Sequence, residues 1–238
     1  MAPTDEFGGV RLYRGDCAPL LKSLPDGAVD HVVTDPPYAE KTHAGARTGR
    51  GDRSLVDFES INDEAFLAFC GDMVRVARRW VVMTCDWRHS AAAERSGLPV
   101  VRCGVLVKPD AAPQFSGDRP GTGWEAVLIL HRKGRKRWNG GGHHAVWTCP
   151  VERNNVHRTQ KPLRLLREWV RLFTDPGETV LDPFMGSATT GVACLQAGRK
   201  FVGVELDPTH YATALKRLRR ADGAGSLFDP KQLTLTDG

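Results

Sequence analysis

An acidic residue, two prolines and an aromatic ring, Asp35-Pro36-Pro37-Tyr38, end an apolar segment that has the pattern of a buried strand. The Asp35 carboxylate and the carbonyl oxygen of Pro36 are two hydrogen-bond acceptors, and the stiff Pro36-Pro37 segment would hold them in place. Two fixed acceptors suit a group with two N–H bonds, such as the exocyclic amine of a nucleobase. Tyr38 adds a flat face on which that base can stack, a contact worth roughly 1–3 kcal/mol.

Two such acceptors can activate an amine for attack on an electrophile. The lone pair of an aromatic amine is delocalised into the ring, so the nitrogen is a poor nucleophile until its N–H bonds are drawn toward tetrahedral geometry. Positive charge builds on the nitrogen when it gains a methyl group, and a carboxylate at Asp35 would stabilise that charge. A Pro-Pro turn closed by an aromatic residue is the purely structural alternative.

A second segment, residues 179–191 (TVLDPFMGSATTG), has the order strand, small-residue loop and helix start. Such loops lie at the carboxyl edge of a parallel sheet, where ligands bind. Gly186 permits close approach of the backbone to a ligand. Glu205 ends the next predicted strand 19 residues later, close to the spacing of about 20 found in nucleoside-binding units, and its carboxylate can accept hydrogen bonds from both hydroxyls of a ribose.

Two other kinds of ligand-binding loop do not fit this segment. Gly186 and Gly191 have the spacing of the phosphate-binding G-x-x-x-x-G, but Val192-Ala193 stands where that loop requires Lys and Ser or Thr. The dinucleotide fingerprint G-x-G-x-x-G is absent. An ordinary strand-to-helix turn is the remaining alternative.

The elements that would position both motifs alternate between strand and helix, which is typical of an α/β sheet covered by helices on both faces. Apolar segments predict strands at residues 10–13, up to 35, 81–84, 100–107, 125–131, 179–181 and 200–205. Periodic segments predict helices at residues 18–24, 63–79, 90–96, 162–173, 189–197 and 208–220. Residues 39–54 should form a surface loop, and residues 132–157 an insertion or edge module instead of sheet.

Composition sets the remaining bounds. At 238 residues and 41% hydrophobic content, the chain suits one substantial domain, and its net charge of +5 suits a polyanionic partner. The six cysteines form no C-x-x-C pair, so neither a zinc knuckle nor a disulfide framework is indicated, and we expect no metal. No segment approaches the ~18 apolar residues of a membrane span, which favours a cytoplasmic protein without a membrane partner.

In combination and in this order, the two motifs resemble the DNA amino-methyltransferases that act on adenine N6 or cytosine N4. The arrangement is similar to their β-class, in which the catalytic motif precedes the cofactor motif. The resemblance runs from Tyr13 to about Arg220. It implies a Rossmann-like methyltransferase domain over residues 1–220 that uses S-adenosylmethionine and flips a base out of double-stranded DNA. Residues 221–238 lack a core pattern, so we expect them to form a loosely held tail.

The resemblance also implies roles for individual residues. Asp35, Pro36, Pro37 and Tyr38 would be catalytic. The residues expected to contact S-adenosylmethionine are Asp16, Cys17, Asp35, Thr159, Gln160, Lys161, Asp182, Phe184, Gly186, Ser187 and Glu205. Ala188 stands where the family usually has glycine, and Arg158 where it usually has proline.

Such enzymes carry a target-recognition insertion, which would fall at about residues 108–157. Basic residues there can contact phosphates, and a tryptophan can stack or wedge when a base leaves the duplex. The residues expected to contact DNA are Lys41, Arg47, Arg50, Arg135, Lys136, Arg137 and Trp138. A solvated basic segment is the alternative for residues 132–137.

Adenine N6 is the favoured target because the resemblance associates an acidic first motif residue with adenine. Cytosine N4 and a non-catalytic DNA-binding protein on the same fold remain alternatives. Carbon-5 methylation needs a Pro-Cys nucleophile, and Cys149-Pro150 has the reverse order. The resemblance leaves a cognate restriction enzyme and a homodimer open.

Overall fold

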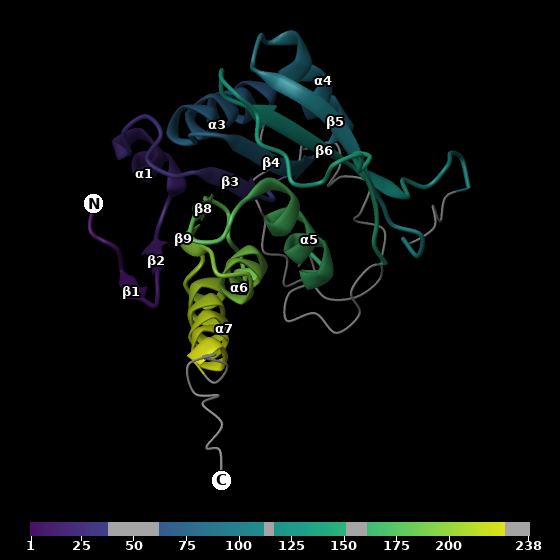
Figure 1. The fold of residues 1–238 in the computed structure, drawn as a ribbon. Coiled ribbons are helices and arrows are strands. Elements are labelled where there is room, and N and C mark those ends of the chain that lie inside the picture. The colour runs from purple at the N-terminus through teal and green to yellow at the C-terminus, as the bar shows by residue number, and fades with distance from the viewer. Residues whose placement is uncertain (38–61, 112–116, 151–160, 227–238) are drawn as a thin grey trace.

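The computed structural model describes residues 1–37, 62–111, 117–150 and 161–226. Within these ranges, nine strands form a single sheet in the order β1-β2-β9-β8-β3-β4-β6-β5-β7 (Figure 1). The strands are β1 (Asp5–Phe7), β2 (Val10–Arg14), β3 (His31–Thr34), β4 (Trp80–Cys85), β5 (Val100–Val107), β6 (Trp124–His131), β7 (Val146–Thr148), β8 (Thr179–Asp182) and β9 (Lys200–Glu205).

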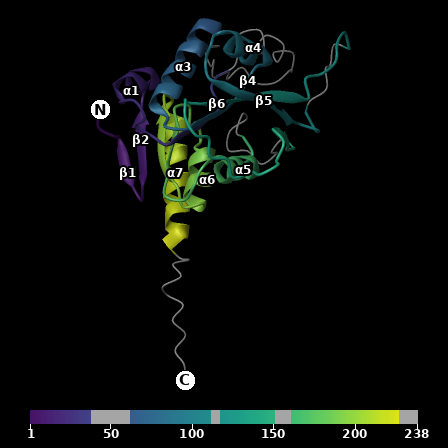
Figure 2. The same cartoon turned by 45° about the horizontal axis from the view of Figure 1, so that its top comes forward.

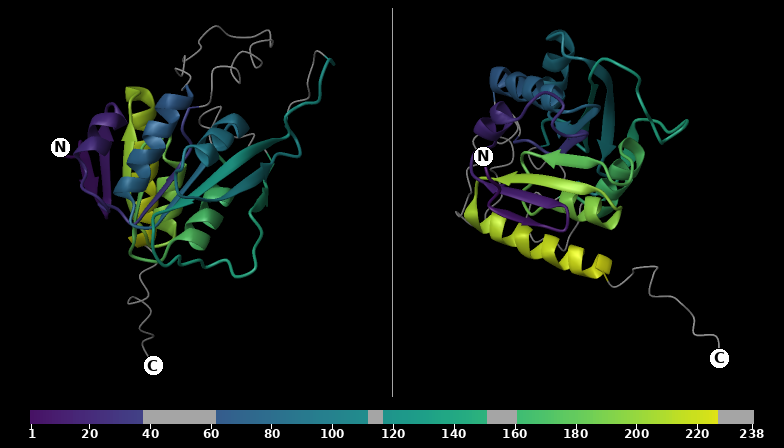
Figure 3. Two further views of the ribbon diagram at one scale, coloured as in Figure 1. Left: turned by 90° about the horizontal axis from the view of Figure 1, so that it is seen from above. Right: turned by 60° about the vertical axis from the view of Figure 1, so that its left-hand side comes forward.

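The described helices cover both faces of this sheet. They are α1 (Cys17–Ser23), α3 (Asp63–Val76), α4 (Trp87–Arg95), α5 (Leu163–Phe173), α6 (Thr189–Gln196) and α7 (Pro208–Ser226). Figures 1 and 2 show α3 and α4 above the strands and α5, α6 and α7 below them. The right-hand view of Figure 3 shows α3 and α7 on opposite sides of the strands. The predicted α/β architecture with helices on both faces is therefore confirmed.

Alternating side chains of the central strands supply the two cores. In β4, Val82 packs into the core under α5 and α6, whereas Val81 and Met83 pack into the core under α1 and α3. Four of the described helices begin with a polar side chain that accepts a hydrogen bond from the first turn; Asn62, for example, accepts from the backbone of Ala65 at 2.8 Å before α3. Burial on both faces explains why these strands are almost continuously apolar.

Strand direction defines two functionally different edges of the sheet. β2, β9, β8, β3 and β4 are parallel, so their carboxyl ends share one edge. β6 is antiparallel to β4, and β5 is antiparallel to β6, so β6 starts and β5 ends at that same edge. From β3 the chain proceeds to β4, whereas from β8 it proceeds to β9 on the other side. The strand order therefore reverses between β3 and β8, which is where open α/β sheets bind ligands.

The sequence located most elements within a few residues, with three differences. Two strands of three residues, β1 and β7, were not predicted. The expectation that residues 132–157 lie outside the sheet is wrong at β7, which pairs in parallel with β5 as an edge strand. Helix α7 continues to Ser226, so the first residues assigned to a loose tail are helical.

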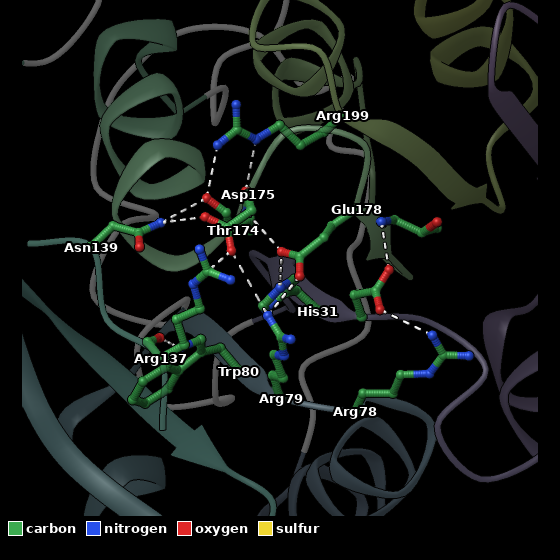
Figure 4. Close-up of polar contacts among 12 residues, drawn as sticks. His31, Arg78, Arg79, Trp80, Arg137, Asn139, Thr174, Asp175, Glu178 and Arg199 are labelled. Atoms are coloured by element: carbon green, nitrogen blue, oxygen red, sulfur yellow. Dashed lines mark hydrogen bonds and ion pairs between the residues drawn. The ribbon is translucent and has the colours of Figure 1, made fainter. Parts of the chain in front are cut away.

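A cluster of charged side chains closes the amino edge, opposite the carboxyl ends (Figure 4). Glu178 lies at its centre: Oε1 accepts a hydrogen bond from Arg79 at 2.6 Å, and Oε2 lies 2.8 Å from Nε2 of His31. The backbone N–H of Asp175 donates to the same Oε2 at 2.7 Å. Burial lowers the pKa of His31. One carboxylate thus links β3, β4 and the turn before β8.

Glu178→Ala should lower the free energy of unfolding by about 2 kcal/mol, because it strips a largely buried carboxylate from Arg79 and His31. Urea denaturation measures the loss. Asp26→Ala is the matched control: that carboxylate is 60% exposed and pairs with two surface arginines, so its removal should cost less than about 1 kcal/mol. Equal losses would show that the Glu178 contacts are worth no more than surface pairs.

Candidate active site

Four of the predicted site residues follow or end adjacent strands at the carboxyl edge. Asp16 follows β2, Glu205 ends β9, Asp182 ends β8 and Asp35 follows β3, and these strands are neighbours in the sheet. The catalytic and cofactor motifs are separated by about 150 residues in sequence, yet β3 and β8 pair directly, through His31 with Val180 and Val32 with Leu181. The structure therefore brings the two motifs together at the reversal of strand order.

Glu205 and the glycine loop meet at the end of β9. Oε2 of Glu205 accepts a hydrogen bond from the backbone of Gly186 at 2.9 Å, and Oε1 accepts one from Asp207 at 2.8 Å. The backbone of Gly15 donates to the carbonyl of Glu205 at 2.9 Å. Burial raises the pKa of the Glu205 carboxyl. Gly186 has a φ of 51°, a conformation that favours glycine.

Asp182 is buried, with 3% exposure, and joins the two motifs. Its Oδ1 accepts hydrogen bonds from the hydroxyl of Thr34 at 2.6 Å and from the backbone of Phe184 at 3.1 Å. Burial raises its pKa to about 7. These contacts of Asp182 tie β8 to β3 and shape the loop that follows.

The rest of the glycine loop is held from inside the protein. Arg217 of α7 donates through Nη1 to the carbonyl of Ser187 at 2.5 Å and to its hydroxyl at 2.7 Å. Ala188 has a φ of 59°, the sole positive φ of a described residue other than glycine. A left-handed alanine is strained, which gives the physical reason why glycine is usual here. A Cβ on Gly191 would come within 2.7 Å of Leu218, so this glycine serves close helix packing.

Three further predicted cofactor residues lie at the carboxyl edge, Asp16 and Cys17 after β2 and Phe184 after β8. Asp16 caps α1 by accepting from the backbone of Ala18 at 2.9 Å. Burial, with a smaller contribution from Asp16, raises the pKa of Cys17 to about 12, so the thiol stays protonated. Phe184 meets the ring of Phe69 edge-on, with centroids 5.3 Å apart.

Asp35 has a partner for each carboxylate oxygen. Oδ1 accepts a hydrogen bond from the hydroxyl of Thr84 at the end of β4, and Oδ2 lies 2.8 Å from Nζ of Lys161, which precedes α5. Nζ of Lys161 also lies 3.3 Å from Oε2 of Glu125 on β6. Glu125 in turn contacts Nζ of Lys108 through Oε1. The predicted cofactor contact Lys161 therefore bonds the predicted catalytic acid.

Several predicted residues lie outside the described ranges. They are Tyr38, Lys41, Arg47, Arg50, Thr159 and Gln160. Their roles stay predictions.

The structure does not bring the predicted basic segment to the carboxyl edge. Arg135, Lys136 and Arg137 follow β6 at its amino-edge end and are exposed. Nε of Arg137 lies 3.0 Å from Oδ2 of Asp175, and its carbonyl accepts from the indole of Trp80 at 2.6 Å (Figure 4). These contacts fix Arg137 against the amino edge, across the sheet from Asp35.

Trp138 also packs at that edge. Its ring lies 5.0 Å from the ring of Phe173 at the end of α5, and its Nε1 donates to the carbonyl of Gly141 at 2.9 Å. The side chain is half-buried against the core and has its hydrogen-bond donor satisfied. The expectation that Trp138 stacks or wedges when a base leaves the duplex stays a prediction, and this position lies across the sheet from Asp35.

Two exposed tryptophans at the carboxyl edge were missed by sequence reasoning. Trp87 starts α4 and is 50% exposed, and Trp124 starts β6 and is 40% exposed. The guanidinium of Arg88 lies 4.4 Å from the ring centroid of Trp87. Trp124 lies two residues before Ala126 on β6, so it points to the same face as Ala126, whose side chain lies in the core under α3 and α4. Trp87 starts α4, which covers that face. The available signal was a tryptophan close to a predicted strand end: Trp124 directly precedes the strand predicted at 125–131, and Trp87 lies three residues after the one predicted at 81–84.

Thr84, Glu125 and Lys108 were missed for a similar reason. Each is a polar residue at the end of an apolar strand, and such a residue is also common where a strand simply meets solvent.

Within the described ranges, no three His, Cys, Asp or Glu side chains converge on a possible metal position. The helices of these ranges include none with the length and apolar character of a membrane span.

Comparisons with known proteins agree with this geometry. Residues 29–216 match the model of a family described as N6/N4 DNA methylases. The putative methylase YubD of Escherichia coli (strain K12) is 33% identical, over 87% of this chain and 89% of its own length. The type II methyltransferase M.Cfr9I of Citrobacter freundii is 26% identical, over 91% and 90%.

Solved structures extend the likeness to three dimensions. M1.HpyAVI in complex with S-adenosylmethionine has a TM-score of 0.64 and 25% identity, covering 88% of this chain and 98% of that one. The cytosine-N4-specific PvuII DNA methyltransferase has a TM-score of 0.69 at 15% identity, covering 92% and 93%, and this likeness concerns the fold alone.

The buried carboxyl of Asp182 predicts a pH-dependent stability. Its pKa is raised from 3.8 to about 7, so between these values the folded protein holds a proton that the unfolded chain releases. The free energy of unfolding should therefore fall as pH rises through this window. Relative to Asp182→Asn, the wild type should lose about 2 kcal/mol between about pH 5 and about pH 8.

Urea denaturation of both proteins without cofactor, at both pH values, measures this difference. Asparagine keeps an oxygen that can accept from Thr34 and Phe184, so the variant removes the titration and preserves the acceptor. A difference between the two proteins that stays constant with pH would contradict the assignment.

Proposed function

Because the chain belongs to the family of N6 and N4 DNA methylases, we propose that it transfers a methyl group from S-adenosylmethionine to the exocyclic N6 amine of adenine in DNA. The observation that carries this proposal is the direct pairing of β3 with β8. This pairing sets the Asp35 carboxylate beside the loop of Gly186 and the acid Glu205, which supports an amine clamp next to a nucleoside site.

The described residues fit this cofactor. A Cβ added at Gly15 or at Gly186 would find no atom within 4 Å, so the backbone at both positions borders open space. Gly15 is bonded to the backbone of Glu205, and Gly186 to its side chain, so these groups line one place. Glu205 would hold the ribose hydroxyls, with Asp16 and Phe184 beside the nucleoside. S-adenosylmethionine would supply the electrophilic methyl group on its sulfonium.

Asp35 would act on the amine by hydrogen bonding. Thr84 bonds one oxygen of its carboxylate and Lys161 the other. A carboxylate can accept hydrogen bonds from several donors at once, so these contacts are compatible with accepting an N–H of the amine. The carbonyl of Pro36 supplies the second acceptor, and Pro37 has no N–H to compete for it. Tyr38 would stack on the base after it leaves the duplex.

The proposed transfer forms one bond, breaks one bond and releases one proton. The amine nitrogen forms a bond to the methyl carbon as the carbon–sulfur bond breaks. The nitrogen carries positive charge at that moment, and the carboxylate of Asp35 stabilises it before one proton leaves to solvent.

Adenine N6 is proposed over cytosine N4 because the first residue of the catalytic motif is the acid Asp35. Methylation of DNA with isotopically labelled S-adenosylmethionine, followed by digestion to nucleosides and mass spectrometry, tests this choice. Labelled N6-methyldeoxyadenosine is the expected product. Labelled N4-methyldeoxycytidine would replace the adenine assignment with the second candidate.

A non-catalytic DNA-binding protein is the candidate from another class. It is disfavoured because Asp35, Gly186 and Glu205 retain the groups that transfer requires. Titration with S-adenosylmethionine separates the two candidates, since a degenerate protein would not bind it.

We further propose that the substrate is double-stranded DNA and that the protein acts in the cytoplasm. Co-purification tests for a cognate restriction enzyme, and sedimentation tests for a homodimer.

Asp35→Ala should abolish methyl transfer and leave S-adenosylmethionine binding within about threefold, because the variant removes the amine acceptor and leaves Gly186 and Glu205 in place. Labelled transfer to DNA and isothermal titration measure the two properties. Glu205→Ala is the complementary variant, and should weaken cofactor binding. Substantial turnover by Asp35→Ala would overturn the role assigned to Asp35.

The opposite positions of the tryptophans and the basic segment give a second prediction. Trp124→Ala should weaken DNA binding about tenfold by removing a stacking surface at the carboxyl edge. Neutralising Arg135 and Lys136 should leave the slope of log affinity against log salt nearly unchanged, because a duplex at Asp35 need not reach the amino edge. Fluorescence anisotropy over a salt series measures both. A flatter slope after neutralisation would show that DNA extends to that edge.

A further inference from the structure

Four neighbouring strands each contribute one polar side chain to the carboxyl edge, on the face that α5 covers. In sheet order the strands are β3, β4, β6 and β5. Each side chain stands two residues from a core residue of that face, and side chains alternate along a strand, so all four point the same way. The pairs are Val33 with Asp35, Val82 with Thr84, Val127 with Glu125, and Leu106 with Lys108.

Lys161 joins these side chains into a row of alternating charge. Its Nζ lies 2.8 Å from Asp35 and 3.3 Å from Glu125. Glu125 is also in contact with Lys108. The row therefore contains two carboxylates and two ammonium groups, which neutralise each other in pairs.

Burial makes the members of the row depend on one another. The side chains of Lys161 and Glu125 are 12% and 13% exposed. A charge at such depth is strongly destabilising unless it is paired. Without Glu125, Lys161 would lose the carboxylate on one side of its ammonium group, and its four-carbon stem would be less restrained. Without Lys161, the carboxylates of Asp35 and Glu125 would lose the cation that they share.

We propose that Glu125 and Lys108 are positioning residues that hold Lys161, and through it the carboxylate of Asp35, in the orientation that accepts the amine. This inference rests on the proposed function. Thr84 and Lys161 together fix the plane of the Asp35 carboxylate, because each bonds a different oxygen. Lys161 thereby acts on the catalytic acid, in contrast to the cofactor contact that the sequence resemblance implied.

Positioning of this kind affects turnover more than binding. A displacement of about 1 Å in a reacting group can cost about 10²-fold in rate. Glu125→Gln should therefore lower kcat about tenfold, and Lys161→Met about a hundredfold, while KM for DNA and the Kd of S-adenosylmethionine change less than about threefold. Lys161→Arg, which keeps the charge, should recover at least about tenfold of the Lys161→Met loss.

A double-mutant cycle tests the order of action. If Glu125 acts through Lys161, then Glu125→Gln should cost less than about twofold further in the Lys161→Met background. Glu168→Gln is the matched control, since that carboxylate lies on α5 and pairs with His143 at 3.2 Å, outside the row. It should keep wild-type kcat. Additive losses from Glu125→Gln and Lys161→Met, or a tenfold weaker cofactor in Lys161→Met with kcat preserved, would overturn the proposal.

A measurement without turnover separates this proposal from the proposed function. In carbon-13 spectra of the side-chain carboxyl groups of the protein without ligands, Asp35→Asn identifies the Asp35 resonance. That resonance should move in Lys161→Met, move less in Glu125→Gln, and stay in place in Glu168→Gln. An unmoved resonance in the first two variants would overturn the row. A wild-type protein that transfers no methyl group would contradict the proposed function, whereas the spectra would still decide whether Glu125 acts on Asp35.

Discussion

The parallel pairing of β3 with β8 is the constraint on which the site depends. It joins two segments about 150 residues apart, and the hydrogen bond from Thr34 to the buried Asp182 fastens their ends at 2.6 Å. After β3 the chain continues toward β4, and after β8 it continues toward β9 on the other side. The loops that follow β3 and β8 therefore diverge and leave room for a ligand between them. The proposed amine clamp follows β3 and the glycine loop follows β8, so this one pairing brings them close together.

Much of this arrangement could be predicted because it depends on local pattern. Apolar segments of four or more residues identified the central strands, and the order of the two motifs identified the family. Strands β1 and β7 are the two edge strands of the sheet and have three residues each. Segments this short show no clear periodic pattern in the sequence. The sequence showed that Ala188 replaces a glycine that is usual in the family. The strain at this alanine follows from its positive φ, which only the structure gives.

What the sequence could not provide was the edge at which each charged residue lies. The basic segment at residues 132–137 has the composition of a phosphate contact, and net charge carries no information about direction. Because β6 is antiparallel to β4, it ends at the amino edge, where those residues follow it, and it starts with Trp124 at the carboxyl edge. For the same reason Glu125 lies at the same edge as Asp35, where both contact Lys161. One reversal of strand direction thus decides which side chains can meet the substrate.

The two edges of the sheet use buried charge in different ways. At the amino edge, Glu178 binds Arg79, His31 and a backbone N–H, so its acceptor capacity serves cohesion. At the carboxyl edge, Asp35 bonds Thr84 through one oxygen and Lys161 through the other, and these contacts orient its carboxylate. Under the proposed function, a carboxylate that binds a neutral amine benefits from donors that fix its plane. The row meets that requirement at little cost in unpaired charge, because Lys161 lies between Asp35 and Glu125, and Glu125 also contacts Lys108.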